Sequence, residues 1–162
     1  MAIDVEFLND RVAALFGQGY FCSKITGIIL QDVLDVKNDE VIKALSAFSG
    51  GVARHGASCG ALNGALAVIG QLFGCGRDGQ DDPRLNKYIQ EVYDGFLLHA
   101  AREFNSVNCQ DIVGVDWWKP EDALAYFRNS AKIARCQRLI VDTIVHTVNT
   151  IGFQGRGWAT CI

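Results

Sequence analysis

Six cysteines are the residues of this sequence with the most distinctive chemistry: Cys22, Cys59, Cys75, Cys109, Cys136 and Cys161. Thiolates bind metal ions and iron–sulfur clusters, and pairs of thiols carry out thiol–disulfide exchange. No pair has the C-x-x-C spacing of common zinc and ferredoxin sites, and no C-x-x-C-H is present, so we expect no covalent haem. Spacing alone leaves a metal site, redox thiols and buried thiols without a function all open.

The positions of single residues narrow these options. Cys59 and Cys75 would lie about 24 Å apart on a continuous helix, too far to ligate one small centre. Cys22 stands at a predicted helix start, where the helix dipole would lower its pKa. The three histidines, His55, His99 and His146, have no paired spacing that would complete a zinc site.

Glycines recur every fourth residue around Cys59, at Gly56, Gly60 and Gly64. On a helix they form a strip of small residues, and each interior glycine costs about 1 kcal/mol relative to alanine. We therefore expect either a close helix–helix crossing or a backbone that approaches a bulky group held by Cys59. The apolar run from 57 to 73 is shorter than the roughly 20 residues of a membrane span, so we expect no span.

Helices must position these residues, because apolar side chains recur with helical periodicity along nearly the whole chain. Asn38 is a predicted cap, and Asp82-Pro83 and Lys119-Pro120 are predicted starts. Residues 74–82 are a predicted loop and 105–119 an irregular segment. We expect one all-α domain over 1–162, a compact bundle of about six to seven helices with a glycine-rich tail from about 152. The predicted helices cover about 3–16, 22–36, 38–48, 58–73, 83–104, a segment from 120, and 131–151.

Composition excludes some functions. Of 162 residues, 49% are hydrophobic and 20% charged, and the formal net charge is -3. This is the composition of a globular protein, and without a stripe of Lys and Arg we expect no nucleic-acid partner. The start, MAIDVEFLND, lacks the basic segment of a signal peptide. We therefore expect a cytoplasmic protein, whose thiols stay reduced.

Four segments in order carry a resemblance to a known family: FCSKITGIIL, FSGGVARHGASCGALNGAL, NCQDIVGVD and ARCQRLIVDTI. Together, over about Gly19 to Thr147, they resemble the redox-active proteins named for the pattern Cys, Gly-Cys-Ala-x-x-Gly, Cys, Cys. They are also similar to the cluster-binding part of the split-Soret cytochromes c. In this chain Cys59 precedes the glycine of its motif, a variant of the family pattern, and the haem attachment sequence of the cytochromes is missing.

The resemblance implies an all-helical fold in which Cys22, Cys59, Cys109 and Cys136 gather at one site. It implies that these four thiolates hold an iron–sulfur centre of the two-iron type in a redox or electron-transfer protein with a redox partner protein. Gly60 and Gly64 would then let backbone and a neighbouring helix approach the centre. Cys75 and Cys161 lie outside the pattern and are interpreted as spare thiols.

Two other functions remain open at this point. A thiol–disulfide oxidoreductase would use a pair of the same cysteines, with Cys22 as the first candidate for the attacking thiol. A cofactor-free helical interaction module would form homodimers, with Trp117 and Trp118 as aromatic anchors or core residues. The sequence assigns neither an enzyme activity nor a substrate.

Overall fold

The computed structural model describes residues 3–152, and these form an all-α bundle without strands, as expected. The glycine-rich tail after Gly152, with Cys161, lies outside the described residues. Across 3–152 every helix is too short or too polar to cross a membrane. The helices, with 3₁₀ and π segments marked η, are α1 (Val5–Gly17), α2 (Cys22–Val33), α3 (Asp39–Ala44), η1 (Leu45–Phe48), α4 (Gly60–Phe73), α5 (Leu85–Gly95), η2 (Phe96–Ala100), α6 (Cys109–Val113), α7 (Pro120–Phe127) and α8 (Ser130–Ile151).

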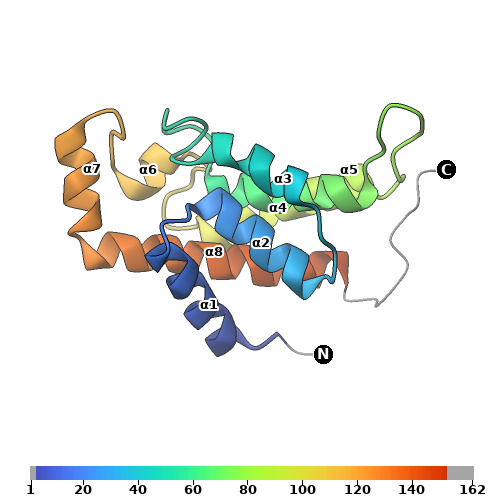
Figure 1. Cartoon of the computed structure of the whole chain (residues 1–162), viewed down its shortest axis with the longest axis horizontal. Helices are drawn as coiled ribbons and strands as arrows, with labels where there is room; N and C mark the ends of the chain where they lie inside the picture. The colour runs from blue at the N-terminus through green and yellow to red at the C-terminus, as the bar shows by residue number, and fades with distance from the viewer. Residues whose placement is uncertain (1–2, 153–162) are drawn as a thin grey trace.

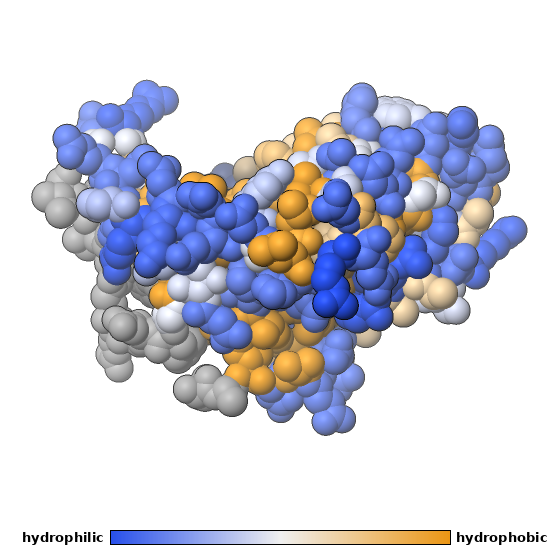
Figure 2. Space-filling model, turned by 180° about the vertical axis from the view of Figure 1, so that it is seen from behind, coloured by the Kyte–Doolittle hydropathy of each residue, from blue (hydrophilic) through white to orange (hydrophobic). Residues whose placement is uncertain are grey.

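The helix α8 runs along the long axis of the molecule, and α1, α2, α4 and α5 pack against it (Figure 1). The helices α6 and α7 lie together at one end, and α5 extends toward the other. Seen from behind the view of Figure 1, the surface is mostly hydrophilic, with smaller hydrophobic patches (Figure 2). The core is filled by buried aliphatic side chains, among them Ile25, Leu30, Leu62, Ile69, Ile140 and Ile144.

The predicted close crossing is confirmed for two of the three glycines and joins α2 to α4. A Cβ on Gly64 would lie 2.5 Å from the carbonyl oxygen of Ser23, and a Cβ on Gly60 would collide with the Cys22 sulfur. Gly56 is different, because it precedes the helix with a φ of 69° and packs against Gln110. The expected strip over all three glycines is therefore wrong at Gly56.

The helix expected over 83–104 is interrupted. It widens to a π turn, η2, directly after Gly95. The ring of His146 on α8 lies against Gly95, where a Cβ would collide with it, and its Nε2 is 3.1 Å from the Glu91 carbonyl oxygen. A side chain that inserts beside the helical hydrogen-bond ladder is a common cause of such distortions.

In the described part of the chain, side chains cap the starts of three helices. Asn38 accepts hydrogen bonds from the N–H groups of Glu40 and Val41, which confirms the predicted cap of α3. Asp4 and Asn129 cap α1 and α8 in the same way. The segment 105–119, expected to be irregular, contains the short helix α6. Because α6 begins at a cysteine, this local helix matters for the site.

Candidate functional site

The structure brings four cysteines together at the end of the bundle where α6 and α7 lie. Each comes from a separate element: Cys22 begins α2, Cys59 precedes α4, Cys109 begins α6 and Cys136 lies in the second turn of α8. All four are free thiols. They line one cavity of about 40 Å³. We call this cavity and its four sulfurs the thiol centre.

Backbone pairing joins the segments that carry Cys59 and Cys109. The Cys59 N–H donates to the Val107 carbonyl and the Cys109 N–H donates to the Ala57 carbonyl, each at 2.8 Å. Gly51 has a φ of 73°, and a Cβ there would lie 2.7 Å from the Cys109 Cβ. A side chain at position 51 would therefore push Cys109 away from its place in the cavity.

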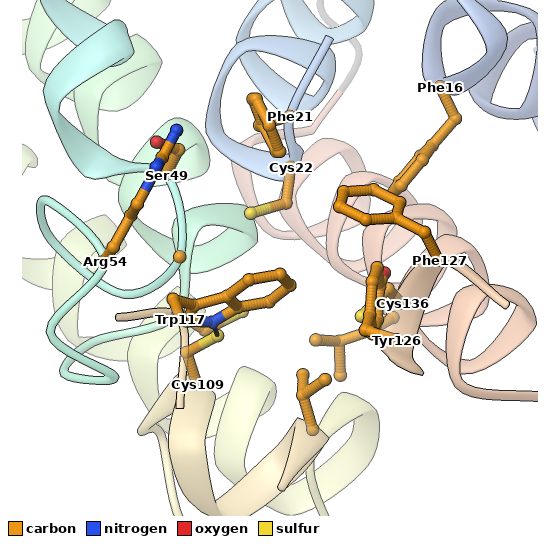
Figure 3. Close-up of a pocket in the computed structure, with 14 residues that line it drawn as sticks. Phe16, Phe21, Cys22, Ser49, Arg54, Cys109, Trp117, Tyr126, Phe127 and Cys136 are labelled. Atoms are coloured by element: carbon orange, nitrogen blue, oxygen red, sulfur yellow. Dashed lines mark hydrogen bonds between the residues drawn. The ribbon is translucent and has the colours of Figure 1, made fainter. Parts of the chain in front are cut away.

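Two aromatic side chains donate hydrogen bonds to the sulfurs. The Trp117 Nε1–H lies 3.4 Å from the Cys109 Sγ, and the buried Tyr126 hydroxyl donates to Cys136. Figure 3 shows Trp117 beside Cys109 and Tyr126 beside Cys136. The two rings also pack edge to face, with centroids 5.0 Å apart. Hydrogen bonds of this kind favour the thiolate form of the sulfur.

Backbone N–H groups serve the other two sulfurs. Cys22 accepts from the N–H groups of Ser23 and Gly50, and Cys59 accepts from the N–H of Ala61. Ser23 and Ala61 belong to the first turns of α2 and α4, whose N–H groups have no partner within the helix. Each of the four sulfurs therefore has a hydrogen-bond donor.

Burial nevertheless raises the pKa of all four thiols. The pKa of Cys22 rises to about 12, because burial disfavours the charged form and the neighbouring Cys109 and Cys136 add repulsion. Burial raises the pKa of Cys109 to about 11. The pKa values of Cys59 and Cys136 also lie above the ordinary value, chiefly through burial. The lowered pKa expected for Cys22 at a helix start is therefore wrong, because burial outweighs the helix dipole.

The arrangement can be tested against metal sites of two kinds. Within residues 3–152, no group of three His, Cys, Asp or Glu side chains is placed to hold a metal ion. A single zinc ion would need its sulfurs about 2.3 Å away, all around one point. An iron–sulfur cluster distributes four thiolates over several irons, and four cysteines are its usual complement. The donor set of the thiol centre is therefore compatible with such a cluster.

Other candidate residues lie elsewhere. Cys75 follows α4 and is disulfide-bonded, so its interpretation as a spare thiol is wrong. Its loop is fixed by an N–H to Asp81 hydrogen bond of 2.7 Å, which holds Cys75 in place for pairing. Among residues 3–152, no histidine lines the cavity: the rings of His99 and His146 are tilted against each other with centroids 5.6 Å apart, and His55 contacts Trp118.

Sequence reasoning missed the roles of several residues at or next to the thiol centre. Trp117 was a candidate for the core or an interface, and the structure shows it lining the cavity. The Gly50-Gly51 pair follows the helix expected over 38–48 and has left-handed backbone, for which paired glycines are a local signal. Tyr126 and Arg54 have no local signal, because only the tertiary fold places them at the cavity.

Comparison with known proteins agrees with the geometry. The family described as "Putative redox-active protein (C_GCAxxG_C_C)" matches residues 20–150, which contain all four cysteines of the thiol centre. No curated protein and no solved structure gives a significant match. The family match supports a redox role. Because it spans most of the sequence, the chain belongs to this family of redox-active cysteine proteins.

Proposed function

We propose that the chain is an electron-transfer protein whose thiol centre holds an iron–sulfur cluster of the two-iron type. The observation that carries this proposal is the convergence of four free thiols, from four separate elements, on one cavity. Cys22, Cys59, Cys109 and Cys136 would be the ligands. Such a cluster supplies one-electron oxidation and reduction.

The surrounding residues have roles that suit this proposal. The donors to the four sulfurs stabilise negative charge on them, and hydrogen bonds to sulfur and exclusion of solvent set the potential of a cluster. Phe21 and Phe127 line the cavity and are also 39% and 53% exposed, so they lie where it meets the solvent. Gly60 and Gly64 allow α2 to approach α4 closely, which brings Cys22 to the cavity.

Thiol–disulfide exchange is a weaker candidate. It needs an attacking thiolate, and an optimal attacking thiol has a pKa near the ambient pH. With pKa values of about 12 for Cys22 and about 11 for Cys109, these thiols are almost entirely protonated at pH 7. A cluster avoids this difficulty, because the positive charge of its irons holds the sulfurs as thiolates.

The cellular setting is part of the same proposal. The cytoplasm keeps thiols reduced, which suits the four free thiols, and the redox partner would be a second protein. The disulfide at Cys75 provides a check on this setting. If rapid acid quenching and thiol labelling of cells find Cys75 oxidised throughout, the protein occupies a more oxidising compartment.

The decisive experiment is an absorption spectrum of anaerobically purified protein, with iron and acid-labile sulfide measured on the same sample. We expect visible absorbance that bleaches with dithionite, and iron and sulfide in equal amounts. Cys22→Ser, Cys59→Ser, Cys109→Ser and Cys136→Ser should each lose most of the iron. Cys75→Ser is the matched control, because Cys75 lies outside the cavity, and it should keep the iron. A folded protein that takes up no iron or sulfide on reconstitution would disprove the proposal.

A further inference from the structure

A second hollow, of about 380 Å³, adjoins the thiol centre between the start of α2 and the end of η1. Phe21, Ser49 and Arg54 line both the hollow and the cavity of the four cysteines, so the two spaces are neighbours. Their linings differ in polarity. The cysteine cavity is mostly apolar, whereas serine and basic side chains contribute much of the wall of the second hollow.

The charged side chains of this hollow are both positive. Lys24 and Arg54 line it, and no Asp or Glu among residues 3–152 does. The ion pairs found within residues 3–152 use other cations, so neither charge is neutralised by a described carboxylate. In a chain with a formal net charge of -3, two uncompensated cations at one hollow are a local excess of positive potential.

Hydroxyl groups add neutral hydrogen-bond donors. Ser46 and Ser49 line the hollow, and Ser49 is partly buried. Neither hydroxyl has a hydrogen bond to another described residue. The Ser23 hydroxyl is different, because it donates to the Leu45 carbonyl at 2.8 Å and is not available to a ligand. Two cations and two available hydroxyls form a donor set for an anionic oxygen group.

A backbone segment of unusual conformation places Arg54 in the wall of this hollow. Gly50, Gly51, Val52, Ala53 and Arg54 all have φ between 50° and 73°. Left-handed backbone costs roughly 1–2 kcal/mol for each non-glycine residue, and it persists only where the surroundings hold it. Here the Arg54 N–H donates to the Ser49 carbonyl at 2.9 Å, which keeps Arg54 next to Ser49 (Figure 3).

We propose that this hollow binds a small anion, with an oxygen-bearing carboxylate or phosphate group held by Lys24, Arg54, Ser46 and Ser49 beside the thiol centre. The site would place an anionic small molecule at the wall that the hollow shares with the thiol centre. The inference does not depend on the cluster, because its contacts are side chains of the hollow and not the four sulfurs.

The test is an NMR titration of ¹⁵N-labelled protein with inorganic phosphate and, separately, with succinate, at constant ionic strength set by chloride. We expect saturable shifts of the Arg54 Nε–H and of the Ser46 and Ser49 amides. The anion with the lower Kd distinguishes a phosphate from a carboxylate site. Lys24→Gln and Arg54→Gln should each weaken binding about tenfold or more, the loss of one charge-assisted contact.

Lys37→Gln is the matched control, because Lys37 is exposed and does not line the hollow. It should leave the Kd unchanged. Lys24→Gln keeps the proposal testable if Arg54→Gln fails to fold. Shifts that never saturate, or an equal loss of affinity in Lys37→Gln, would overturn it. Binding of an acidic peptide without binding of either small anion would also overturn it, in favour of a protein-docking surface. Because metal-free protein can be used, the result is separate from that of the iron and sulfide assay.

Discussion

The two halves of the thiol centre are constructed differently. Cys22 and Cys59 lie at the starts of α2 and α4, and their donors are backbone N–H groups. Cys109 and Cys136 lie on α6 and α8, and their side-chain donors are Trp117 and Tyr126. The first pair, which we call the α2–α4 half, is therefore fixed by how closely two helices approach. The second pair, the α6–α8 half, is fixed by which side chains are present.

Because of this difference, substitutions in the two halves should affect different properties of the protein. No substitution removes a backbone N–H other than proline, so the α2–α4 half can be altered only by disturbing the helix crossing at Gly60 and Gly64. In the other half a donor can be deleted while its ring is kept, as in Tyr126→Phe. We therefore expect changes in the α2–α4 half to cost folding free energy and changes in the α6–α8 half to alter the chemistry of the sulfurs.

The largest effect should follow Gly64→Ala. The new Cβ would lie 2.5 Å from the Ser23 carbonyl oxygen and 2.9 Å from the Thr26 Cβ, so α2 would have to move away. We expect a loss of about 2–3 kcal/mol in the free energy of unfolding, measured by urea denaturation. Gly70→Ala, on the same helix with nothing within 4 Å, is the control and should gain about 0.5–1 kcal/mol. Equal changes in both variants would contradict the crossing.

The crossing of α2 and α4 was predictable from the sequence, because its signal is local. Glycines four residues apart on an apolar helix indicate a close approach, and the structure confirms it at Gly60 and Gly64. The same spacing misled at Gly56, because a period alone does not say where the helix begins. The all-α fold was predictable for a similar reason, since periodicity and caps such as Asn38 are local signals.

The surroundings of the sulfurs were less predictable, because they depend on long-range packing. A helix start gives a thiol a favourable dipole, but how deeply Cys22 is buried depends on α4, α6 and α8. Nothing near Tyr126 in the sequence indicates that its hydroxyl faces Cys136, ten residues later. The four ligand candidates were recognisable as a set only through the family resemblance, since their spacing matches no local motif.

The second-largest effect should be a loss of folding stability at high pH, which tests the α2–α4 half in metal-free protein. The pKa of Cys22 rises from an ordinary value of 9.0 to about 12 on folding. The folded state then holds its proton more tightly than the unfolded state, and this stabilisation is complete below pH 9 and lost as the pH rises toward 12. We expect a loss on the order of 2 kcal/mol for this partly buried thiol, less than the full shift implies.

Urea denaturation at pH 7, 9, 10 and 11 measures this loss. Tyr and Lys side chains also titrate above pH 10, so the comparison is with Cys22→Ser, which lacks the thiol and should lose less stability over the same interval. If the wild-type and Cys22→Ser proteins decline in parallel, burial of Cys22 does not contribute to the pH dependence.

The smallest effect, and the most specific to the α6–α8 half, should follow Tyr126→Phe. The ring is kept, so its packing on Trp117 and Phe127, at 5.0 and 5.2 Å between centroids, can persist while only the hydrogen bond to Cys136 is lost. In metal-free protein the pKa of Cys136 should rise further, seen as slower alkylation at pH 9. In loaded protein the reduced, more negative state loses a donor, so the potential should fall by about 60 mV, equivalent to 1.4 kcal/mol for one electron.

Trp117→Phe should lower the potential in the same direction, because it removes the donor to Cys109, 3.4 Å away. Phe127→Leu is the control, since Phe127 lines the same cavity and donates no hydrogen bond. If Phe127→Leu lowers the potential as much as Tyr126→Phe does, loss of a hydrogen-bond donor is not what sets the potential. If the two donor variants lower it and Phe127→Leu does not, the α6–α8 half is where this chain adjusts the electron affinity of its centre.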